Sequence, residues 1–269
     1  MPEKIRLDTA LFERGLVSSR EKAKALVMAG EVYLNGVRAE KPGVQTVEKD
    51  IIEVRSKGMP YVSRGGYKLE KALRVFQLDL NGVTAADIGA STGGFTDCML
   101  QNGAAKIYAV DVGYGQLDWK LRSDSRVVSL ERTNFRYITP EQIPEPLDFA
   151  SADVSFISLD LILPALFPLQ RPGAMAVCLI KPQFEAGKEK VGKKGVVREP
   201  SVHREVTEHV TDFSVKHGYS ALALDFSPVR GPQGNIEYLL LLSKDGRQKN
   251  EISAQDIQSV VTAAHNMEI

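Results

Sequence analysis

The chain has 269 residues, of which 43% are hydrophobic and 25% are charged, and these proportions are typical of a soluble globular protein. Its length suits one small domain and one medium-sized domain. The 34 basic and 34 acidic residues cancel, so no overall positive charge indicates a nucleic-acid partner. Evidence for such a partner has to come from local clusters.

The N-terminus and the cysteines bear on the cellular compartment. The sequence Met-Pro-Glu-Lys-Ile-Arg lacks the apolar core of a signal peptide, and no run approaches the ~18 apolar residues that span a bilayer. Cys98 and Cys178 each lie in an apolar run and form neither a CxxC pair nor a zinc pattern. We expect a cytoplasmic protein with two buried thiols, no stable membrane association and no bound metal.

Residues 6–29 predict two short helices. Gly15 is expected to close the first helix, because glycine readily adopts the left-handed conformation that ends a helix. Ser18 or Ser19 is expected to cap the second helix through its hydroxyl group.

A hairpin and a further strand complete the first domain. Asn35-Gly36 lies between apolar residues and predicts a two-residue turn, and Asp50-Ile-Ile-Glu-Val-Arg predicts a strand. Residues 56–63 have the composition of a linker. The expected organisation is a small α+β domain at 1–59, a linker at 60–63 and a second domain at 64–269.

The second domain alternates strand-like and helix-like segments, which indicates a mainly parallel sheet with helices on both faces. We expect a Rossmann-like α/β fold with one antiparallel strand near its end. The expected strands are 84–88, 106–111, 126–130, 147–154, 174–180, 220–226 and 236–243. The expected helices are 67–77, 93–102, 115–122, 158–168, 202–217 and 251–266.

A basic cluster lies at the junction of the first two helices. Arg14, Arg20, Lys22 and Lys24 stand against Glu21, a net charge of 4 − 1 = +3. Such a cluster is either a solvated helix face or a contact for a phosphate backbone, together with the N-terminal amides of the second helix. Charge alone does not decide between them.

The first domain resembles the αL RNA-binding domain, which is named after ribosomal protein S4. The motifs that carry the likeness lie in order along residues 5–55 and are Arg6-Leu-Asp, Arg14-Gly-Leu, Ser18-Ser-Arg, Ala23, Gly30, Val32 and Asn35-Gly36. The resemblance implies RNA binding. The phosphate contacts it implies are Arg6, Arg14, Arg20 and Lys24.

A glycine-rich loop follows the first strand of the second domain. Its sequence, Ala86-Asp-Ile-Gly-Ala-Ser-Thr-Gly-Gly-Phe-Thr, lets the backbone approach a ligand at the carboxyl edge of the sheet. The spacing matches neither the G-x-G-x-x-G of dinucleotide-binding proteins nor a P-loop. A plain turn between a strand and a helix is the alternative.

The acids beside this loop favour a cationic cofactor. Asp87 precedes the first glycine, where it would repel a pyrophosphate but suit the ammonium and sulfonium groups of S-adenosylmethionine. Asp111 ends the next strand and can accept both hydroxyls of a ribose. We therefore expect S-adenosylmethionine as the cofactor. The expected contacts are Asp87, Gly89, Ala90, Ser91, Thr92, Gly93, Gly94, Phe95 and Asp111.

Four charged residues are expected at the same edge of the sheet. Asp153 and Lys181 end two strands, Glu237 begins the last strand, and Lys68 lies just ahead of the first strand. Each alone could be an exposed charge at a strand end, but four that converge indicate a reaction centre.

Methyl transfer to a ribose 2′-hydroxyl needs such a set. The displacement depends on alignment of the reacting atoms, and the hydroxyl must lose its proton near the transition state. A lysine accepts that proton only when its pKa falls from ~10.4, and a neighbouring ammonium with partial desolvation lowers it. We assign this role to Lys181, with Lys68 as the neighbouring cation and with Asp153 and Glu237 as orienting groups.

The order Lys-Asp-Lys-Glu resembles the tetrad of FtsJ-type ribose 2′-O-methyltransferases. With the αL domain in front, the chain resembles the TlyA-like ribosomal RNA methyltransferases over residues 5–243. The further motifs are Asp111-Val-Gly-Tyr-Gly-Gln-Leu, Arg132-Thr-Asn, Asp153-Val-Ser-Phe-Ile-Ser-Leu and Lys181-Pro-Gln-Phe-Glu. The resemblance implies an S-adenosylmethionine methyltransferase fold, 2′-O-methylation of a cytidine, and ribosomal RNA or ribosomal subunits as partners. It also implies cofactor contacts from Val112, Asn134 and Asp153, and an RNA contact from Arg64.

A second basic segment follows Lys181. Residues 181–198 hold six basic and two acidic residues, a net charge of 6 − 2 = +4, together with three glycines. The segment is either a flexible solvated insertion or a clamp over the target RNA. The candidate contacts are Lys188, Lys190 and Lys193.

Two other functions remain open at this point. The TlyA-like family carries a historical haemolysin name, but a membrane-active toxin needs an amphipathic or apolar lytic segment, and none is visible in the sequence. A non-catalytic RNA-binding factor for ribosome assembly would not need the four charged residues. His203, His209 and His217 form no metal-ligand cluster, and we interpret them as structural.

Overall fold

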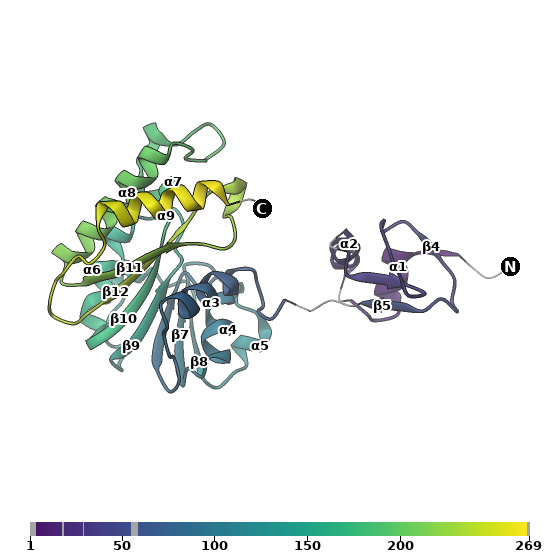
Figure 1. The fold of residues 1–269 in the computed structure, drawn as a ribbon. Helices are drawn as coiled ribbons and strands as arrows, with labels where there is room; N and C mark the ends of the chain where they lie inside the picture. The colour runs from purple at the N-terminus through teal and green to yellow at the C-terminus, as the bar shows by residue number, and fades with distance from the viewer. Residues whose placement is uncertain (1–3, 18, 29, 55–58, 268–269) are drawn as a thin grey trace. The chain divides into compact units, whose positions relative to one another are not determined.

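The computed structural model describes residues 4–17, 19–28, 30–54 and 59–267, and the chain separates into two compact units, Met1–Pro60 and Tyr61–Ile269 (Figure 1). Ser18 and residues 55–58, which we expected in a helix cap, a strand end and a linker, lie outside the described residues. Residues 61–63, also expected in the linker, belong to the second unit. In the described part of the chain, no helix is long and apolar enough to cross a membrane.

The first unit combines two short helices with short strands. Its elements are β1 (Ile5–Arg6), α1 (Leu7–Glu13), α2 (Arg20–Met28), β2 (Val32–Leu34), β3 (Val37–Arg38), β4 (Gln45–Thr46) and β5 (Ile52–Val54). Gly15 follows α1 with a left-handed φ of 68°, and the Ser19 hydroxyl accepts a hydrogen bond from the backbone of Lys22 at the start of α2. Asn35 and Gly36, with φ of 51° and 81°, form the expected turn between β2 and β3.

The strands of the first unit form two small sheets. β2 lies between β3 and β5 in an antiparallel sheet, and β1 pairs with β4. We did not predict the pair of β1 and β4, because strands of two residues are too short to show an alternating pattern. Leu7 and Leu11 of α1 and Val32 of β2 are fully buried in the core of this unit.

The second unit is built on a seven-stranded sheet. Its strands are β6 (Thr84–Ile88), β7 (Lys106–Val110), β8 (Val127–Leu130), β9 (Leu147–Ala152), β10 (Gln170–Ile180), β11 (Ser220–Phe226) and β12 (Tyr238–Ser243). They follow the order β11-β12-β10-β9-β6-β7-β8. Only β12 runs antiparallel to its neighbours, and the remaining pairs are parallel. This arrangement confirms the expected α/β sheet with one antiparallel strand.

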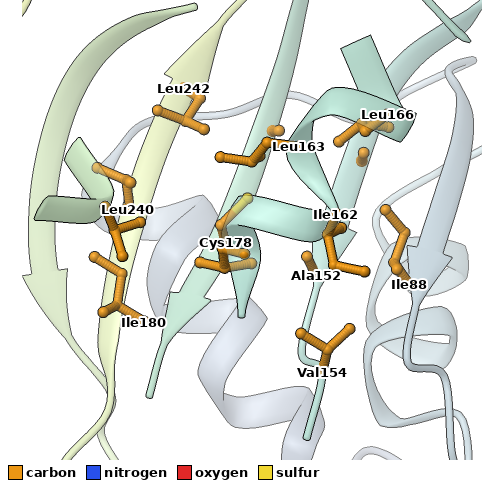
Figure 2. Packing of buried hydrophobic residues seen from close by; sticks show 14 of the residues in the cluster. Ile88, Ala152, Val154, Ile162, Leu163, Leu166, Cys178, Ile180, Leu240 and Leu242 are labelled. Atoms are coloured by element: carbon orange, nitrogen blue, oxygen red, sulfur yellow. The ribbon is translucent and has the colours of Figure 1, made fainter. Parts of the chain in front are cut away.

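Helices cover both faces of this sheet (Figure 1). They are α3 (Gly65–Val75), α4 (Gly94–Gln101), α5 (Trp119–Arg122), α6 (Leu163–Leu166), α7 (Pro182–Glu185), α8 (Pro200–Lys216) and α9 (Ala254–Asn266). Alternation along β10 shows the two layers: Val177 and Leu179 pack with α3, α4 and α5, whereas Cys178 packs with α6, α8 and α9. Figure 2 shows Leu163 of α6 next to Cys178, and Leu166 of the same helix farther along this layer. Both cysteine thiols are free and buried, as expected.

One expected helix is broken in the structure. Residues 158–168 form two 3-10 turns, Leu159–Leu161 and Phe167–Leu169, on either side of the short helix α6. The physical reason is that Pro164 and Pro168 lack the N–H group that a continuous helix needs.

Candidate active site

The carboxyl edge of the sheet gathers the four charged residues. Asp153 follows β9, Lys181 follows β10, and Lys68 lies on α3. Glu237 reaches the same edge because it precedes the antiparallel strand β12. The Lys68 ammonium lies 3.0 Å from Asp153 Oδ2 and 2.6 Å from Glu237 Oε2, and the Lys181 ammonium lies 2.5 Å from Asp153 Oδ1. One carboxylate therefore bridges the two lysines.

This cluster is shielded from water. The exposed fraction of the side chain is 11% for Lys68, 8% for Lys181, 16% for Asp153 and 0% for Glu237. Burial raises the pKa of Asp153, but the ammonium groups of Lys68 and Lys181 lower it by more, so the pKa lies below its usual value. Burial lowers the pKa of Lys68, and the carboxylates of Asp153 and Glu237 turn this into a net rise. Asp153 is thus held ionised and Lys68 is held protonated.

The glycine-rich loop leads from β6 into α4. Gly89 has a φ of 86°, and a Cβ at this position would lie 2.7 Å from the backbone oxygen of Asp153. Gly93 caps α4 with a φ of 95°. Only glycine fits both the conformation and the close approach at position 89. The loop is thereby placed against the strand end that carries Asp153.

Asp87 lies beneath this loop and not at its surface. It is fully buried, and its carboxylate accepts hydrogen bonds from the backbone and hydroxyl of Thr96 at 2.8 and 2.6 Å and from the hydroxyl of Ser151 at 3.2 Å. Burial raises the pKa of Asp87 to about 7, although these hydrogen bonds act against the rise. The structure therefore gives Asp87 a bracing role at the start of α4, in place of the direct cofactor contact that we expected.

Three cavities meet at this edge of the sheet. The loop cavity, about 360 Å³, is lined by the glycine-rich loop, Asp111, Val112 and Asn134. The central cavity, about 600 Å³, is also lined by residues of the glycine-rich loop, together with Arg64 and all four charged residues. The basic cavity, about 740 Å³, lies between Lys181 and the basic segment. Ser155, two residues after Asp153, lines all three cavities.

The groups around the loop cavity fit the adenosine part of S-adenosylmethionine. The Asp111 carboxylate accepts the backbone N–H groups of Ser91 at 2.8 Å and of Gly113 at 2.7 Å, one on each oxygen. A carboxylate oxygen has a second lone pair, so each can also accept a ribose hydroxyl. The Asn134 side-chain oxygen accepts a backbone N–H, which leaves its amide nitrogen as a donor for a base. Val112 adds an exposed apolar side chain.

Sequence reasoning missed three residues of the basic cavity: Phe156, Gln183 and Phe184. Phe156 has a φ of 63° and is 91% exposed, and its ring lies 4.9 Å from the ring of Phe184. Gln183 and Phe184 lie on α7, a short helix inside the segment that we expected to be a loop. Pro182 was the available signal, because proline favours the first turn of a helix.

The basic segment is anchored at its C-terminal end. The Asn235 amide donates to the carbonyl of Gly195 at 3.0 Å, and a ring nitrogen of the buried His203 lies 3.0 Å from the carbonyl of Val197. Burial lowers the pKa of His203 to about 4, which keeps this histidine neutral and agrees with a structural role.

The three candidate RNA contacts of the basic segment have different surroundings. Lys190 pairs with Glu205 of α8, Lys188 lines the basic cavity, and Lys193 is exposed.

The basic residues of the first unit are engaged within that unit to different degrees. Arg6 lies 2.9 Å from the buried carboxylate of Asp8, and Arg20 lies 3.9 Å from it. Arg14 donates hydrogen bonds to three backbone carbonyls between residues 47 and 50, so its guanidinium helps to hold that turn. All four candidate phosphate contacts, Arg6, Arg14, Arg20 and Lys24, are exposed.

The family models of known proteins cover both units. The FtsJ-like methyltransferase model matches residues 61–244, and the S4 domain model matches residues 5–52. These matches confirm the resemblances to the FtsJ-type enzymes and to the αL domain.

Relatives match along nearly the whole chain. A Bacillus subtilis protein named "Putative rRNA methyltransferase YqxC" is 53% identical over 98% of this chain and 95% of its own length. The Mycobacterium tuberculosis protein named "16S/23S rRNA (cytidine-2'-O)-methyltransferase TlyA" is 42% identical over 98% of both chains. A solved structure described as "Putative hemolysin from Streptococcus thermophilus" has a TM-score of 0.77 at 51% identity and covers 98% of this chain and 96% of that one.

The FtsJ-like match spans every strand of the second unit's sheet, and the relatives extend the likeness across the S4 domain. The chain therefore belongs to the FtsJ-like methyltransferase family, in a form that carries an S4 domain at its N-terminal end.

Proposed function

We propose that this protein transfers a methyl group from S-adenosylmethionine to the 2′-hydroxyl of a cytidine in ribosomal RNA. The observation that carries the proposal is the position of Lys181. Its ammonium pairs with Asp153, and its side chain lies on the wall between the central cavity and the basic cavity. A group in that position can meet a cofactor from one side and a nucleotide from the other. The name of the Mycobacterium tuberculosis relative supports the choice of cytidine in ribosomal RNA.

The loop cavity and the central cavity suit the cofactor. When bound, S-adenosylmethionine supplies an electrophilic methyl group on a positively charged sulfur. Asp111 would hold the ribose hydroxyls and Asn134 the adenine, because these are the groups that line the loop cavity with free hydrogen-bonding capacity. The glycine-rich loop would follow the methionine part, and the ionised Asp153 would face the sulfonium side.

Lys181 would take the proton from the 2′-hydroxyl. Only the neutral amine can accept that proton, and its position is fixed by the hydrogen-bonding carboxylate of Asp153. Asp153 is held in turn by Lys68, and Lys68 is held by the buried Glu237. Three of the four residues thus act mainly by alignment, which supplies a large part of the rate in a displacement reaction.

The RNA would be held by basic residues of both units. We assign the S4 domain, residues 1–59, to binding of the ribosomal RNA, with phosphate contacts from Arg6, Arg14, Arg20 and Lys24. Arg64 at the central cavity and Lys188 and Lys193 of the basic segment would contact the strand near the target. Phosphate contacts of this kind make affinity fall with salt. Such an enzyme acts where ribosomes are assembled, in the cytoplasm.

Transfer of tritium from labelled S-adenosylmethionine tests the proposal. The wild-type protein is incubated with deproteinised ribosomal RNA and with each ribosomal subunit, and 2′-O-methyl groups are mapped on RNA from cells with and without the gene. We expect one or a few cytidines to depend on the gene, and no transfer by Lys181→Ala. RNA binding without any transfer would favour the non-catalytic assembly factor, and leakage from lipid vesicles with the pure protein would favour the haemolysin.

A further inference from the structure

The wall of the basic cavity contains an amide whose oxygen has no hydrogen-bond donor among the described residues. Gln183 lines this cavity together with Lys181, which lies two residues earlier in the chain. The side-chain carbonyl oxygen of Gln183 is shielded from water and accepts no hydrogen bond from the described part of the chain. A shielded acceptor without a donor is rare and costly in folded proteins. This position therefore needs a partner that the chain itself does not supply.

Gln183 is fixed by its neighbours on both sides. The backbone N–H of Phe184 donates to the carbonyl of Lys181 at 2.9 Å, so α7 starts directly at the reacting lysine. At the other end of α7, the Glu185 carboxylate accepts hydrogen bonds from the hydroxyl of Ser158 at 2.6 Å and from the backbone N–H of Leu159 at 2.9 Å. The short helix that carries Gln183 is thus held by hydrogen bonds at both ends.

The other amides on the cavity wall have different roles. Asn235 donates to the carbonyl of Gly195 and so holds the basic segment. Gln233 lies in an exposed turn with a φ of 55°. Gln183 is the amide that combines closeness in the chain to Lys181, a clamped backbone and a shielded acceptor.

We propose that Gln183 recognises the base of the target nucleotide through its Watson–Crick edge. This inference rests on the proposed function, in which the nucleotide whose 2′-hydroxyl faces Lys181 enters the basic cavity. A primary amide offers an acceptor beside a donor, and cytosine offers a 4-amino donor beside the N3 acceptor. When the base enters, the Gln183 side chain turns its amide from the cavity wall toward the base, so that the carbonyl oxygen receives a hydrogen of the 4-amino group and the amide nitrogen donates to N3.

Paired changes in the protein and the RNA test this contact. Full-length wild type and Gln183→Leu, which keeps the approximate size of the side chain, are compared on ribosomal RNA fragments. The fragments carry at the mapped target either cytidine, a pyrimidinone ribonucleoside without the 4-amino group, or an abasic ribose that keeps its 2′-hydroxyl. Gln255→Leu on the exposed side of α9 is the matched control. Melting temperature and cofactor affinity are measured for each protein.

On cytidine, Gln183→Leu should raise the KM for RNA by about tenfold, which corresponds to the loss of about one or two hydrogen bonds. Its melting temperature should be equal to or above that of wild type, because the unpartnered acceptor is removed, and its cofactor affinity should stay unchanged. Loss of the 4-amino group should raise the KM of wild type but not that of Gln183→Leu. On abasic RNA the two proteins should have equal KM values, because the contact is already absent.

Two results would overturn the inference. The first is an unchanged KM on cytidine. The second is a penalty for Gln183→Leu that persists on abasic RNA, since the residue would then act on the position of Lys181 and not on the base. If wild type methylates none of the RNAs, the proposed function fails and this inference fails with it, and that outcome is distinct from the other two.

Discussion

Asp87 and Asp153 lie on neighbouring strands of the same sheet, near the same edge, and both carboxylates are largely withdrawn from water. Their surroundings differ in charge. Asp87 receives hydrogen bonds from the uncharged groups of Thr96 and Ser151, and burial raises its pKa to about 7. Asp153 lies between Lys68 and Lys181, and its pKa falls below the usual value.

The comparison teaches that the partner, and not the burial, decides what a strand-end carboxylate can do. Neutral donors leave Asp87 close to losing or gaining a proton at physiological pH, which suits a structural brace under the loop. The neighbouring Lys68 and Lys181 hold the pKa of Asp153 below its usual value, which suits a group that orients a lysine and faces a sulfonium. The effects of mutations around these two sites should differ accordingly.

The largest effect should come from Lys181, the lysine whose amine reaches both the central and the basic cavity. Lys181→Ala should lower the single-turnover rate by about a thousandfold or more, while RNA and cofactor still bind, because general-base catalysis contributes about 10² to 10⁴ and alignment is lost as well. The measurement is methyl transfer at saturating RNA and cofactor, with equilibrium binding measured in parallel.

Lys181→Arg separates the base from the cation. Arginine keeps the positive charge beside Asp153, but its pKa above ~12 prevents it from accepting a proton. We expect no rescue of the rate. Substantial activity of this variant across pH 6–10 would leave alignment as the only role of Lys181.

The ion pair between Lys68 and Glu237 can be tested through the free energy of unfolding. Lys68→Met leaves the fully buried Glu237 without the cation that pairs with it, and breaking a buried ion pair costs about 3–5 kcal/mol. The double variant Lys68→Met with Glu237→Gln should regain much of this loss, because the unpaired charge is removed too. Urea unfolding at pH 7.5 measures both. A double variant no more stable than the single one would contradict the pairing.

The sequence predicted the large features of this site for a clear reason. Strand periodicity places Asp153, Lys181 and Glu237 at strand ends, and the direction of parallel strands then brings such ends together. The β strands and the loop glycines could be predicted on the same basis, since Gly89 and Gly93 have the left-handed conformations that their motif implies.

The remaining features depend on contacts between segments far apart in the chain. Asp87 and Asp153 look alike in the sequence, and only the positions of Lys68 and Lys181 in space distinguish their charge states. Arg14 looks like a phosphate ligand until the carbonyls of residues 47–50 are seen around its guanidinium. Gln183 lies inside the motif Lys181-Pro-Gln-Phe-Glu, but the motif does not show that its side-chain oxygen lacks a donor, because that can be recognised only when its surroundings are known.

Asp87 predicts a pH dependence of stability that Asp153 does not share. Its folded pKa of about 7 lies above the unfolded value near 3.9, so the folded state binds the proton more tightly. Its contribution is therefore most favourable below pH ~4 and is lost as pH rises towards ~7. Asp87→Asn stays neutral, so wild type should lose a few kcal/mol relative to this variant between pH 4 and 8.

Chemical unfolding of wild type and Asp87→Asn at several pH values measures this difference. The Asp153 carboxyl behaves in the opposite sense, because its folded pKa is lowered: its contribution is present above the unfolded pKa and lost as pH falls through the folded pKa. Parallel stability curves for wild type and Asp87→Asn would show that Asp87 is not held near neutrality by its surroundings.

Asp111, directly after the next strand, extends the comparison to a carboxylate that accepts the backbone N–H groups of Ser91 and Gly113. Asp111→Ala should weaken S-adenosylmethionine binding by ~1.5–3 kcal/mol, or about tenfold to more than a hundredfold, because charge-assisted hydrogen bonds to the ribose are lost. Titration calorimetry checks this, with Asp212→Ala on the exposed face of α8 as the control. Equal affinities of wild type and Asp111→Ala would remove Asp111 from the cofactor site.

The smallest effect is expected from an exposed lysine, the opposite extreme from Lys181. Lys24→Ala on α2 removes one phosphate contact, so RNA affinity should fall only a few-fold, and the slope of log K against log salt should become shallower by ~0.7–0.9. Lys49→Ala, an exposed lysine of the same unit outside the basic cluster, is the matched control. Filter binding from 50 to 300 mM salt measures both slopes. Because an exposed charge has no buried partner to leave behind, the fold should be unaffected and the whole effect should disappear at high salt. An affinity loss that is independent of salt would mean that Lys24 acts on the structure of the S4 domain and not on phosphate.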